Sequence, residues 1–126
     1  MTAIIDYDAG NIKSVEKALL MLGEEACITR DREKILAAER VILPGVGAFG
    51  SAMEKLCAFG LKDVILEVIA RGVPFLGICL GLQLLFESSQ ESPGVKGLGV
   101  LPGEILRLPR EGGIRVPHIG WNSLAF

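Results

Sequence analysis

The chain has 126 residues, half of them hydrophobic, which is enough for one domain with a sizeable core. Its formal net charge of -2, with scattered basic residues, gives no general reason to expect a nucleic acid or an anionic membrane as a partner. The three cysteines are widely spaced and form no CxxC pair, so they are expected to be reduced thiols of a cytosolic protein rather than disulfides or metal ligands. No apolar run approaches the ~18 residues that a bilayer crossing requires.

The first two thirds of the sequence alternate between strand and helix patterns. Short buried-type strands are expected at residues 3–5, 26–29, 41–43 and 75–78. Apolar residues from Ile12 to Leu22 recur at helical spacing, and Gly23 is the residue type that favours a left-handed C-cap. A charged, helix-compatible segment precedes the third strand, and a further helical pattern runs from about Ser51 to Gly72 with a break at Gly60. A last helix is expected at residues 82–86.

Residues 87–126 no longer alternate between strand and helix patterns. Residues 87–97 form a polar loop, and short strand-like pieces follow at 100–101, 104–108 and 115–119 without a helix between them. We interpret this part as a hairpin-like extension of the same domain, so that residues 1–126 form a single unit. Strands separated by helices predict an α/β fold: an open, mostly parallel sheet with helices on both faces.

Two glycine-containing motifs follow neighbouring strands of this predicted sheet. Residues 44–50 read PGVGAFG after the third strand, and residues 77–83 read GICLGLQ at the end of the fourth. Sites in open parallel sheets form at the carboxyl ends of the strands. We therefore expect both motifs to face one another across one crevice.

Cys79 is the candidate nucleophile in the second motif. Glycines two residues before and two after it, at a strand-to-helix junction, are typical of a nucleophile elbow, in which a Cβ at either flank would collide with backbone. The following helix favours the thiolate, and the Leu80 N–H is expected to point at a developing oxyanion. The alternative is a buried cysteine at a strand end, which is the interpretation adopted for Cys27 and Cys57.

The loop Gly45-Val46-Gly47 is the candidate source of a second oxyanion donor. That donor normally comes from a different loop than the nucleophile, and the Val46 N–H is the candidate. Taken alone, such a loop is often only a tight turn. It lacks the lysine of a phosphate-binding loop and the spacing of a dinucleotide-binding fingerprint.

Four sequence motifs together resemble those of one protein family. These motifs are PGVGAFG, GICLGLQ, DYDAGNIKSV at residues 6–15 and VPHIGWN at residues 116–122. They resemble the class I, triad-type glutamine amidotransferases, whose fold is flavodoxin-like. Within that family the resemblance is to the glutaminase subunits of imidazole glycerol phosphate synthase, which act in histidine biosynthesis. It extends over the whole chain.

The resemblance implies an activity and its residues. Cys79 would attack the side-chain amide of glutamine, form a glutamyl thioester and release ammonia, without a cofactor or metal. Val46 and Leu80 would supply the oxyanion hole, and Gly45, Gly47 and Gln83 would contact the glutamine. The ammonia would pass to a (βα)8-barrel cyclase partner in a heterodimer. The residues implied on the partner-facing side are Asn11, His118, Trp121 and Asn122.

Several of these residues have a second interpretation. Asn11 could cap the first helix, and Trp121 could belong to the core. His118 is the only histidine, but a base needs an orienting carboxylate, and no Asp or Glu follows Glu111. In the family the base and its carboxylate form a His-x-Glu pair farther downstream, so we expect the chain to be the N-terminal two thirds of the domain and nearly inactive alone. The rival functions are a class I amidotransferase subunit of another synthase and a non-catalytic partner-binding module.

Overall fold

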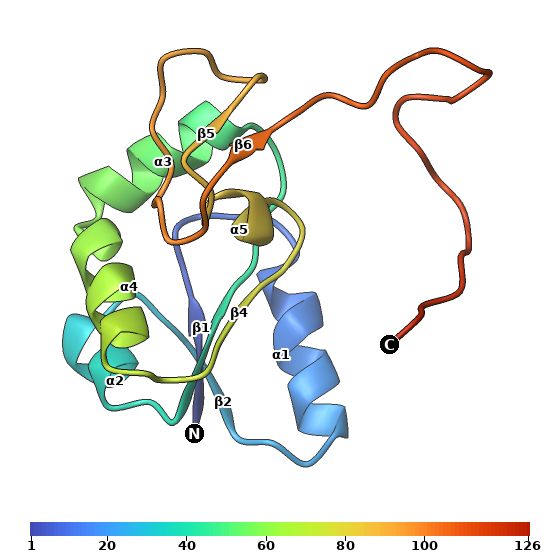
Figure 1. Cartoon of the computed structure of the whole chain (residues 1–126). Coiled ribbons are helices and arrows are strands. Elements are labelled where there is room, and N and C mark those ends of the chain that lie inside the picture. The colour runs from blue at the N-terminus through green and yellow to red at the C-terminus, as the bar shows by residue number, and fades with distance from the viewer.

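A computed structural model describes all residues from Met1 to Phe126, and its centre is a parallel sheet (Figure 1). The sheet has the strand order β2-β1-β3-β4. Its strands are β1 (Thr2–Ile5), β2 (Ala26–Thr29), β3 (Arg40–Leu43) and β4 (Phe75–Gly77). In the register, Ile4 lies opposite Ile28 and Ile42. The predicted strands and their parallel arrangement are confirmed.

Helices cover both faces of the sheet, as the alternating sequence pattern predicts (Figure 1). One face carries α1 (Ile12–Met21), and the other carries α2 (Arg32–Leu36), α3 (Phe49–Ala58) and α4 (Leu61–Ala70). This distribution follows from right-handed crossovers, because the chain moves one way from β1 to β2 and the opposite way from β2 to β3 and β4. None of the helices combines the length and the hydrophobicity that a membrane crossing requires.

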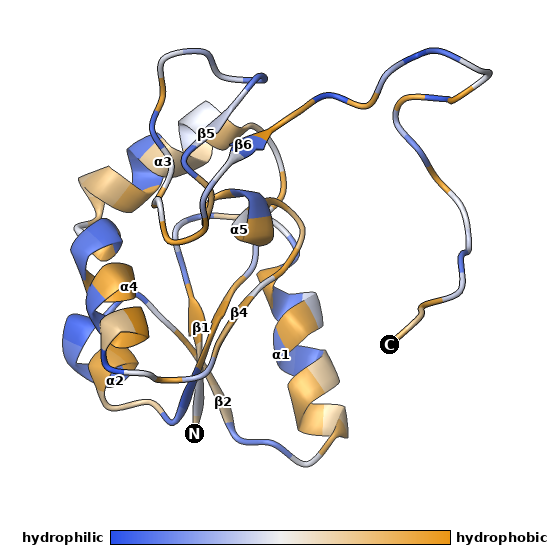
Figure 2. Cartoon of the chain, in the orientation of Figure 1, coloured by the Kyte–Doolittle hydropathy of each residue, from blue (hydrophilic) through white to orange (hydrophobic).

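The core is concentrated on the face that carries α2, α3 and α4. Most of its buried residues come from the sheet and these helices, whereas α1 has no fully buried residue. Figure 2 shows the hydrophobic strands β1 and β4 between the helices, with hydrophilic residues on the outward sides of α2 and α4. At the end of α1 the side chains of Leu20, Met21 and Leu22 are mostly exposed. The α1 face is therefore the less covered side of the sheet.

The helix ends follow the sequence signals. Gly23 has φ +79°, and the Glu24 N–H donates to the Leu19 carbonyl at 3.0 Å, so α1 ends in the predicted left-handed cap. Asp31 caps α2 by accepting a hydrogen bond from the Lys34 N–H at 3.2 Å. The predicted break between α3 and α4 falls at Gly60, which has φ +67°.

The second half departs from the predictions. Helix α5 spans only Leu80–Gln83, because the chain continues as turns where residues 84–86 were expected to be helical. The polar loop contains β5 (Ser88–Ser89), which pairs with β6 (Glu104–Ile105) in parallel and not as a hairpin. Residues 100–101, 106–108 and 115–119 are not strands.

The reason for these departures is the absence of pairing partners along the chain. Val100 and Leu101 pack their side chains against the core, and the Leu101 N–H donates to the Leu85 carbonyl at 2.9 Å instead of to a neighbouring strand. After β6 the chain runs as an extended segment, residues 106–126, that leaves the body of the domain (Figure 1). Alternating apolar residues form a strand only where another strand offers hydrogen bonds.

Candidate active site

The turn from β4 into α5 holds Cys79 in an unusual backbone conformation. Its φ is 55° and its ψ is -119°, a region that a residue with a Cβ rarely occupies, and its side chain is exposed. Backbone strain of this kind costs on the order of 1–3 kcal/mol and persists only where the surroundings enforce it. The chain is therefore bent so that the thiol lies outside the core, as the elbow pattern predicts.

The two glycines that flank Cys79 are required by close backbone contacts. A Cβ on Gly77 would lie 2.7 Å from the Leu82 Cα, and a Cβ on Gly81 would lie 1.8 Å from the Leu43 carbonyl oxygen. Both distances are shorter than any normal contact. The predicted reason for glycine at these positions is confirmed, and Gly81 also brings α5 directly against the end of β3.

The loop after β3 contacts this elbow, as predicted from the sheet topology. The Ile78 N–H donates to the Leu43 carbonyl at 3.0 Å, and the Leu80 N–H donates to the Gly45 carbonyl at 3.3 Å. The second of these bonds is long for an N–H···O bond, which typically spans about 2.7–3.2 Å. The two glycine motifs, far apart in sequence, thus form one local structure at the carboxyl edge of the sheet.

Val46 and Gly47 lie at the exposed side of this loop. Gly47 has φ +98°, a conformation that favours glycine, and Val46 is 44% exposed. The Val46 N–H donates to no backbone carbonyl. A cavity of about 150 Å³ lies beside the loop and is lined by residues 7–9, 46–48, 51–52 and 55.

Tyr7 lies beneath the loop, and no role was predicted for it, although it belongs to the DYDAGNIKSV motif. The tyrosine is 1% exposed, and its hydroxyl donates to the Pro44 carbonyl at 2.6 Å. Burial, together with the negative charge of a Cys79 thiolate, raises the pKa of Tyr7 to about 12. Tyr7 therefore stays a neutral hydrogen-bond donor over the physiological pH range.

Gln83 lies at the end of α5 in a second cavity of about 620 Å³, which also contains Glu91. The Glu91 carboxylate accepts a hydrogen bond from the Phe49 N–H at 3.2 Å, and the neighbouring Ser92 hydroxyl accepts one from the Gly50 N–H at 2.9 Å. This loop thereby caps α3, the helix that directly follows the PGVG loop. Glu91 was missed because the contact joins residues 42 positions apart, which no local pattern indicates.

The residues implied on the partner-facing side are not brought together. Asn11 occupies the N-cap position of α1 with φ 63°, but its side chain makes no capping hydrogen bond, so the capping interpretation is wrong. His118, Trp121 and Asn122 belong to the extended segment, residues 106–126, which leaves the body of the domain (Figure 1). The Trp121 side chain is 102% exposed, which excludes the core interpretation.

The other two cysteines differ from Cys79 and from each other. Cys27 in β2 is half-buried, and its Sγ contacts the Ile28 carbonyl at 3.8 Å, as expected of a packing residue. Cys57 on α3 is exposed, so the expectation that it packs in the core is wrong. Any test of Cys79 reactivity therefore needs Cys57 as an internal control. No three His, Cys, Asp or Glu side chains are grouped as metal ligands.

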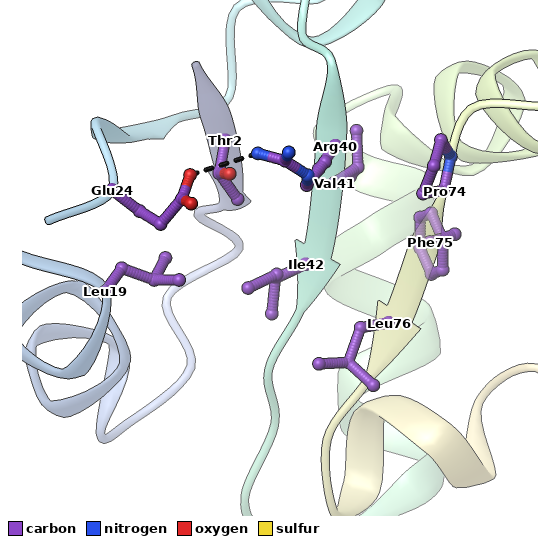
Figure 3. Close-up of a pocket in the computed structure, with 9 residues that line it drawn as sticks. All are labelled: Thr2, Leu19, Glu24, Arg40, Val41, Ile42, Pro74, Phe75 and Leu76. Atoms are coloured by element: carbon purple, nitrogen blue, oxygen red, sulfur yellow. Dashed lines mark hydrogen bonds and ion pairs between the residues drawn. The ribbon is translucent and has the colours of Figure 1, made fainter. Parts of the chain in front are cut away.

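A further cavity of about 410 Å³ lies on the sheet away from the elbow (Figure 3). Figure 3 shows Leu19 of α1 beside Ile42 of β3 and Leu76 of β4, with the Glu24–Arg40 ion pair at the rim at 3.0 Å. Several of its residues, including Thr2 and Pro74, lie near the starts of strands, at the edge opposite Cys79. This hollow is therefore separate from the candidate site.

In this parallel α/β sheet, one strand ends in a strained turn that exposes a cysteine, and the neighbouring strand ends in a glycine loop beside that turn. This arrangement defines a domain of the nucleophile-elbow class. Comparison with known families narrows this class. The model of the family "Glutamine amidotransferase class-I" matches residues 3–124. The chain belongs to the class-I glutamine amidotransferase family.

Two relatives illustrate the similarity within the family. The imidazole glycerol phosphate synthase subunit HisH of Methanothermobacter thermautotrophicus is 53% identical over 124 residues, which cover 98% of this chain and 61% of the relative. The subunit of the same name from Moorella thermoacetica is 58% identical, with 98% of this chain and 58% of the relative covered. The chain thus spans about three fifths of the length of these curated relatives.

A solved structure gives independent support for the fold. A crystal structure of a glutamine amidotransferase matches with a TM-score of 0.70 at 24% identity, covering 83% of this chain and 56% of the other. At this identity the likeness concerns the fold alone. It agrees with the predicted open parallel sheet with helices on both faces.

Proposed function

We propose that this chain carries the nucleophile of a glutaminase that releases ammonia from glutamine for histidine biosynthesis. The observation that carries the proposal is the exposed thiol of Cys79 on its strained turn, with the PGVG loop in contact. The Cys79 thiolate attacks the side-chain amide carbon of glutamine, the C–N bond breaks, and ammonia leaves. Water then cleaves the thioester and frees glutamate.

The negative oxygen formed by this attack needs donors in the loop and in α5. The Leu80 N–H is one candidate, but it now donates to the Gly45 carbonyl. If the Gly45–Val46 peptide turns over, its carbonyl leaves Leu80 and its Val46 N–H takes that place, so that both N–H groups face the substrate oxygen. The long 3.3 Å bond between Leu80 and Gly45 makes this change inexpensive.

Gly45, Gly47 and Gln83 are the proposed contacts to glutamine. Gln83 can donate and accept through its side-chain amide, and its cavity also holds Glu91. A carboxylate there suits the α-ammonium group of an amino acid, so Glu91 joins the proposed site. The glycines allow the substrate to approach the backbone closely.

A thiol nucleophile also needs a group that accepts its proton and returns one to the leaving ammonia. His118 is an unsuitable base because it lies on the extended segment, in a hollow lined only by residues of that segment. The resemblance implies that this base is the His of a His-x-Glu pair downstream of the part of the relatives that this chain matches. Residues 1–126 alone are therefore expected to hydrolyse glutamine at least about 100-fold more slowly than a complete relative.

The proposed partner is a (βα)8-barrel cyclase subunit, which would form a heterodimer with the chain and use the ammonia. The extended segment supports a docking role, since Ile119, Trp121 and Phe126 are almost fully exposed. Trp121, with Asn11, His118 and Asn122, is proposed to contact this partner in the cytoplasm. No cofactor is needed for the reaction.

Modification with a chloroketone analogue of glutamine tests the chemistry. The thiolate adds to the ketone carbonyl, which places negative charge on the carbonyl oxygen in the oxyanion site, and then displaces chloride from the neighbouring carbon to form a stable thioether. Chloride leaves without a proton, so no base is needed to protonate a leaving group. Labelling that is confined to Cys79, and that glutamine slows by competition, would support the proposal. Iodoacetamide, which needs no glutamine site, should modify the exposed Cys57 as well. Equal labelling of Cys57 and Cys79 by both reagents would favour a non-catalytic module.

Binding measurements test the partner. The chain is expected to bind the cyclase subunit of the synthase from a relative such as Moorella thermoacetica, and Trp121→Ala is expected to weaken binding by at least about 2 kcal/mol. Binding to the acceptor enzyme of a different synthase, with none to this cyclase, would favour the first rival function.

A further inference from the structure

Tyr7 carries a buried hydroxyl beside the PGVG loop, and the proposed chemistry gives this group no role. It lies just after β1 within the hydrophobic core cluster, and its hydroxyl donates to the Pro44 carbonyl at 2.6 Å. Water has no access to replace this bond, because the tyrosine is 1% exposed. The hydroxyl is therefore a fixed attachment point for the first residue of the PGVG loop.

The same hydroxyl also lies against the next residue of the loop. A Cβ built on Gly45 would be 2.4 Å from the Tyr7 oxygen and 2.9 Å from the Gly81 N atom. The tyrosine and the first turn of α5 thus both crowd Gly45 at the position where a side chain would begin. The Pro44–Gly45 peptide can hardly move unless the tyrosine moves.

The following peptide is held much less firmly. The Gly45–Val46 peptide is attached through its carbonyl to the Leu80 N–H at 3.3 Å, at the long limit of a hydrogen bond. On its other side, Gly47 permits the positive φ of 98°. Of two successive peptides, the first is anchored in the core and the second can turn.

We propose that Tyr7 is a positioning residue for the oxyanion site: it holds the Pro44 carbonyl and so confines the movement of the loop to the Gly45–Val46 peptide. A turn of that one peptide then presents the Val46 N–H beside the Leu80 N–H in a single, reproducible place. Without the hydroxyl, both peptides rotate together and Val46 is spread over several positions. This inference rests on the proposed function of Val46 and Leu80. The raised pKa of Tyr7 is consistent with it, because the phenol stays protonated while Cys79 is a thiolate.

The test uses Tyr7→Phe, which keeps the ring and removes the hydroxyl. Labelling of Cys79 by the chloroketone analogue is measured over a range of concentrations in the 126-residue chain. The maximal rate is expected to fall roughly three- to tenfold, which corresponds to about 0.65–1.4 kcal/mol and lies within the usual contribution of one hydrogen bond. The concentration that gives half the maximal rate, and the rate with iodoacetamide, are expected to stay within about twofold, because glutamine contacts and thiol exposure are unchanged.

A spectroscopic measurement separates positioning from general stability. With ¹⁵N-labelled valine, the Val46 amide resonance is expected to shift or broaden in Tyr7→Phe, while those of Val64 and Val68 in α4 stay unchanged. Ile35→Val, a buried change in α2, serves as the control for lost stability and should leave both Val46 and the labelling rate unaltered.

The results distinguish the positioning role of Tyr7 from the proposed function of Cys79. An unchanged maximal rate and an unchanged Val46 resonance in Tyr7→Phe would overturn the role of Tyr7. A change of the same size in Ile35→Val would do so too. If the unmodified chain shows no selective labelling at Cys79, the proposed function fails, and the Val46 resonance still reports whether Tyr7 positions the loop.

Discussion

Gly81→Ala is the substitution that tests the packing of the elbow most severely. The added Cβ would lie 1.8 Å from the Leu43 carbonyl oxygen and 2.8 Å from its carbon. To restore a 3.0 Å contact, α5 must move away from the end of β3 by roughly 1 Å or more. The same Leu43 carbonyl accepts the Ile78 N–H, so this shift also weakens a hydrogen bond of the elbow.

The expected loss can be worked out from these two effects. Overpacking of a closely packed region costs about 1–3 kcal/mol and a lost hydrogen bond adds about 1 kcal/mol, so the free energy of unfolding should fall by about 2–4 kcal/mol. Gly23→Ala is the matched control, because that position has φ +79° and nothing within 4 Å of an added Cβ. In this control only the left-handed backbone is unfavourable for alanine, which should lower the free energy of unfolding by about 1–2 kcal/mol.

Urea denaturation followed by circular dichroism measures both variants, and chloroketone labelling measures the thiol. Gly81→Ala is expected to lose selective labelling of Cys79, since the turn that exposes it is displaced, whereas Gly23→Ala keeps the wild-type rate. A Gly81→Ala protein as stable as Gly23→Ala, with normal labelling, would refute the reasoning about this contact.

Three further predictions follow from the surroundings of the site. The pKa of Tyr7 is raised from 10.0 to about 12, so its contribution to stability is complete below pH 10 and is lost as the pH rises towards 12. Over that pH range, urea titrations should show that the wild type loses about 2–3 kcal/mol more of its free energy of unfolding than Tyr7→Phe. Glu91→Ala removes the acceptor of the Phe49 N–H and is expected to cost about 1 kcal/mol, seen as a lower melting temperature, while alanine at an exposed glutamate within α3 costs little. His118→Ala should leave the labelling rate of Cys79 within about twofold of wild type, and a larger loss would show that this histidine acts as the base.

Sequence patterns were sufficient to predict the sheet and the turn that exposes Cys79. The apolar strand runs and the glycine cap of α1 are signals carried within a few residues, and the glycine spacing around Cys79 is a known motif, although Gly81 is required by the distant Leu43 carbonyl. The topology then placed the two glycine loops together. Tyr7 and Glu91 could not be found in this way, because their roles come from contacts with Pro44 and Phe49 that exist only after folding.

The same distinction explains the predictions that were wrong. Cys57 sits at helical spacing but on the outer side of α3, and only the packing of that helix decides which side is outer. Asn11 is a residue type that caps helices, yet its left-handed backbone leaves its side chain without a capping bond. Residues 115–119 were expected to be strand-like, but no strand lies beside them.

The central claim is that one thiol of this chain is held ready for attack on glutamine. Peptide mapping by mass spectrometry after treatment with the chloroketone analogue, with and without excess glutamine, tests it most directly. The account predicts modification at Cys79 that glutamine prevents, and none at Cys27 or the exposed Cys57. Modification of Cys57 in preference to Cys79, or labelling of Cys79 that glutamine leaves unchanged, would contradict it.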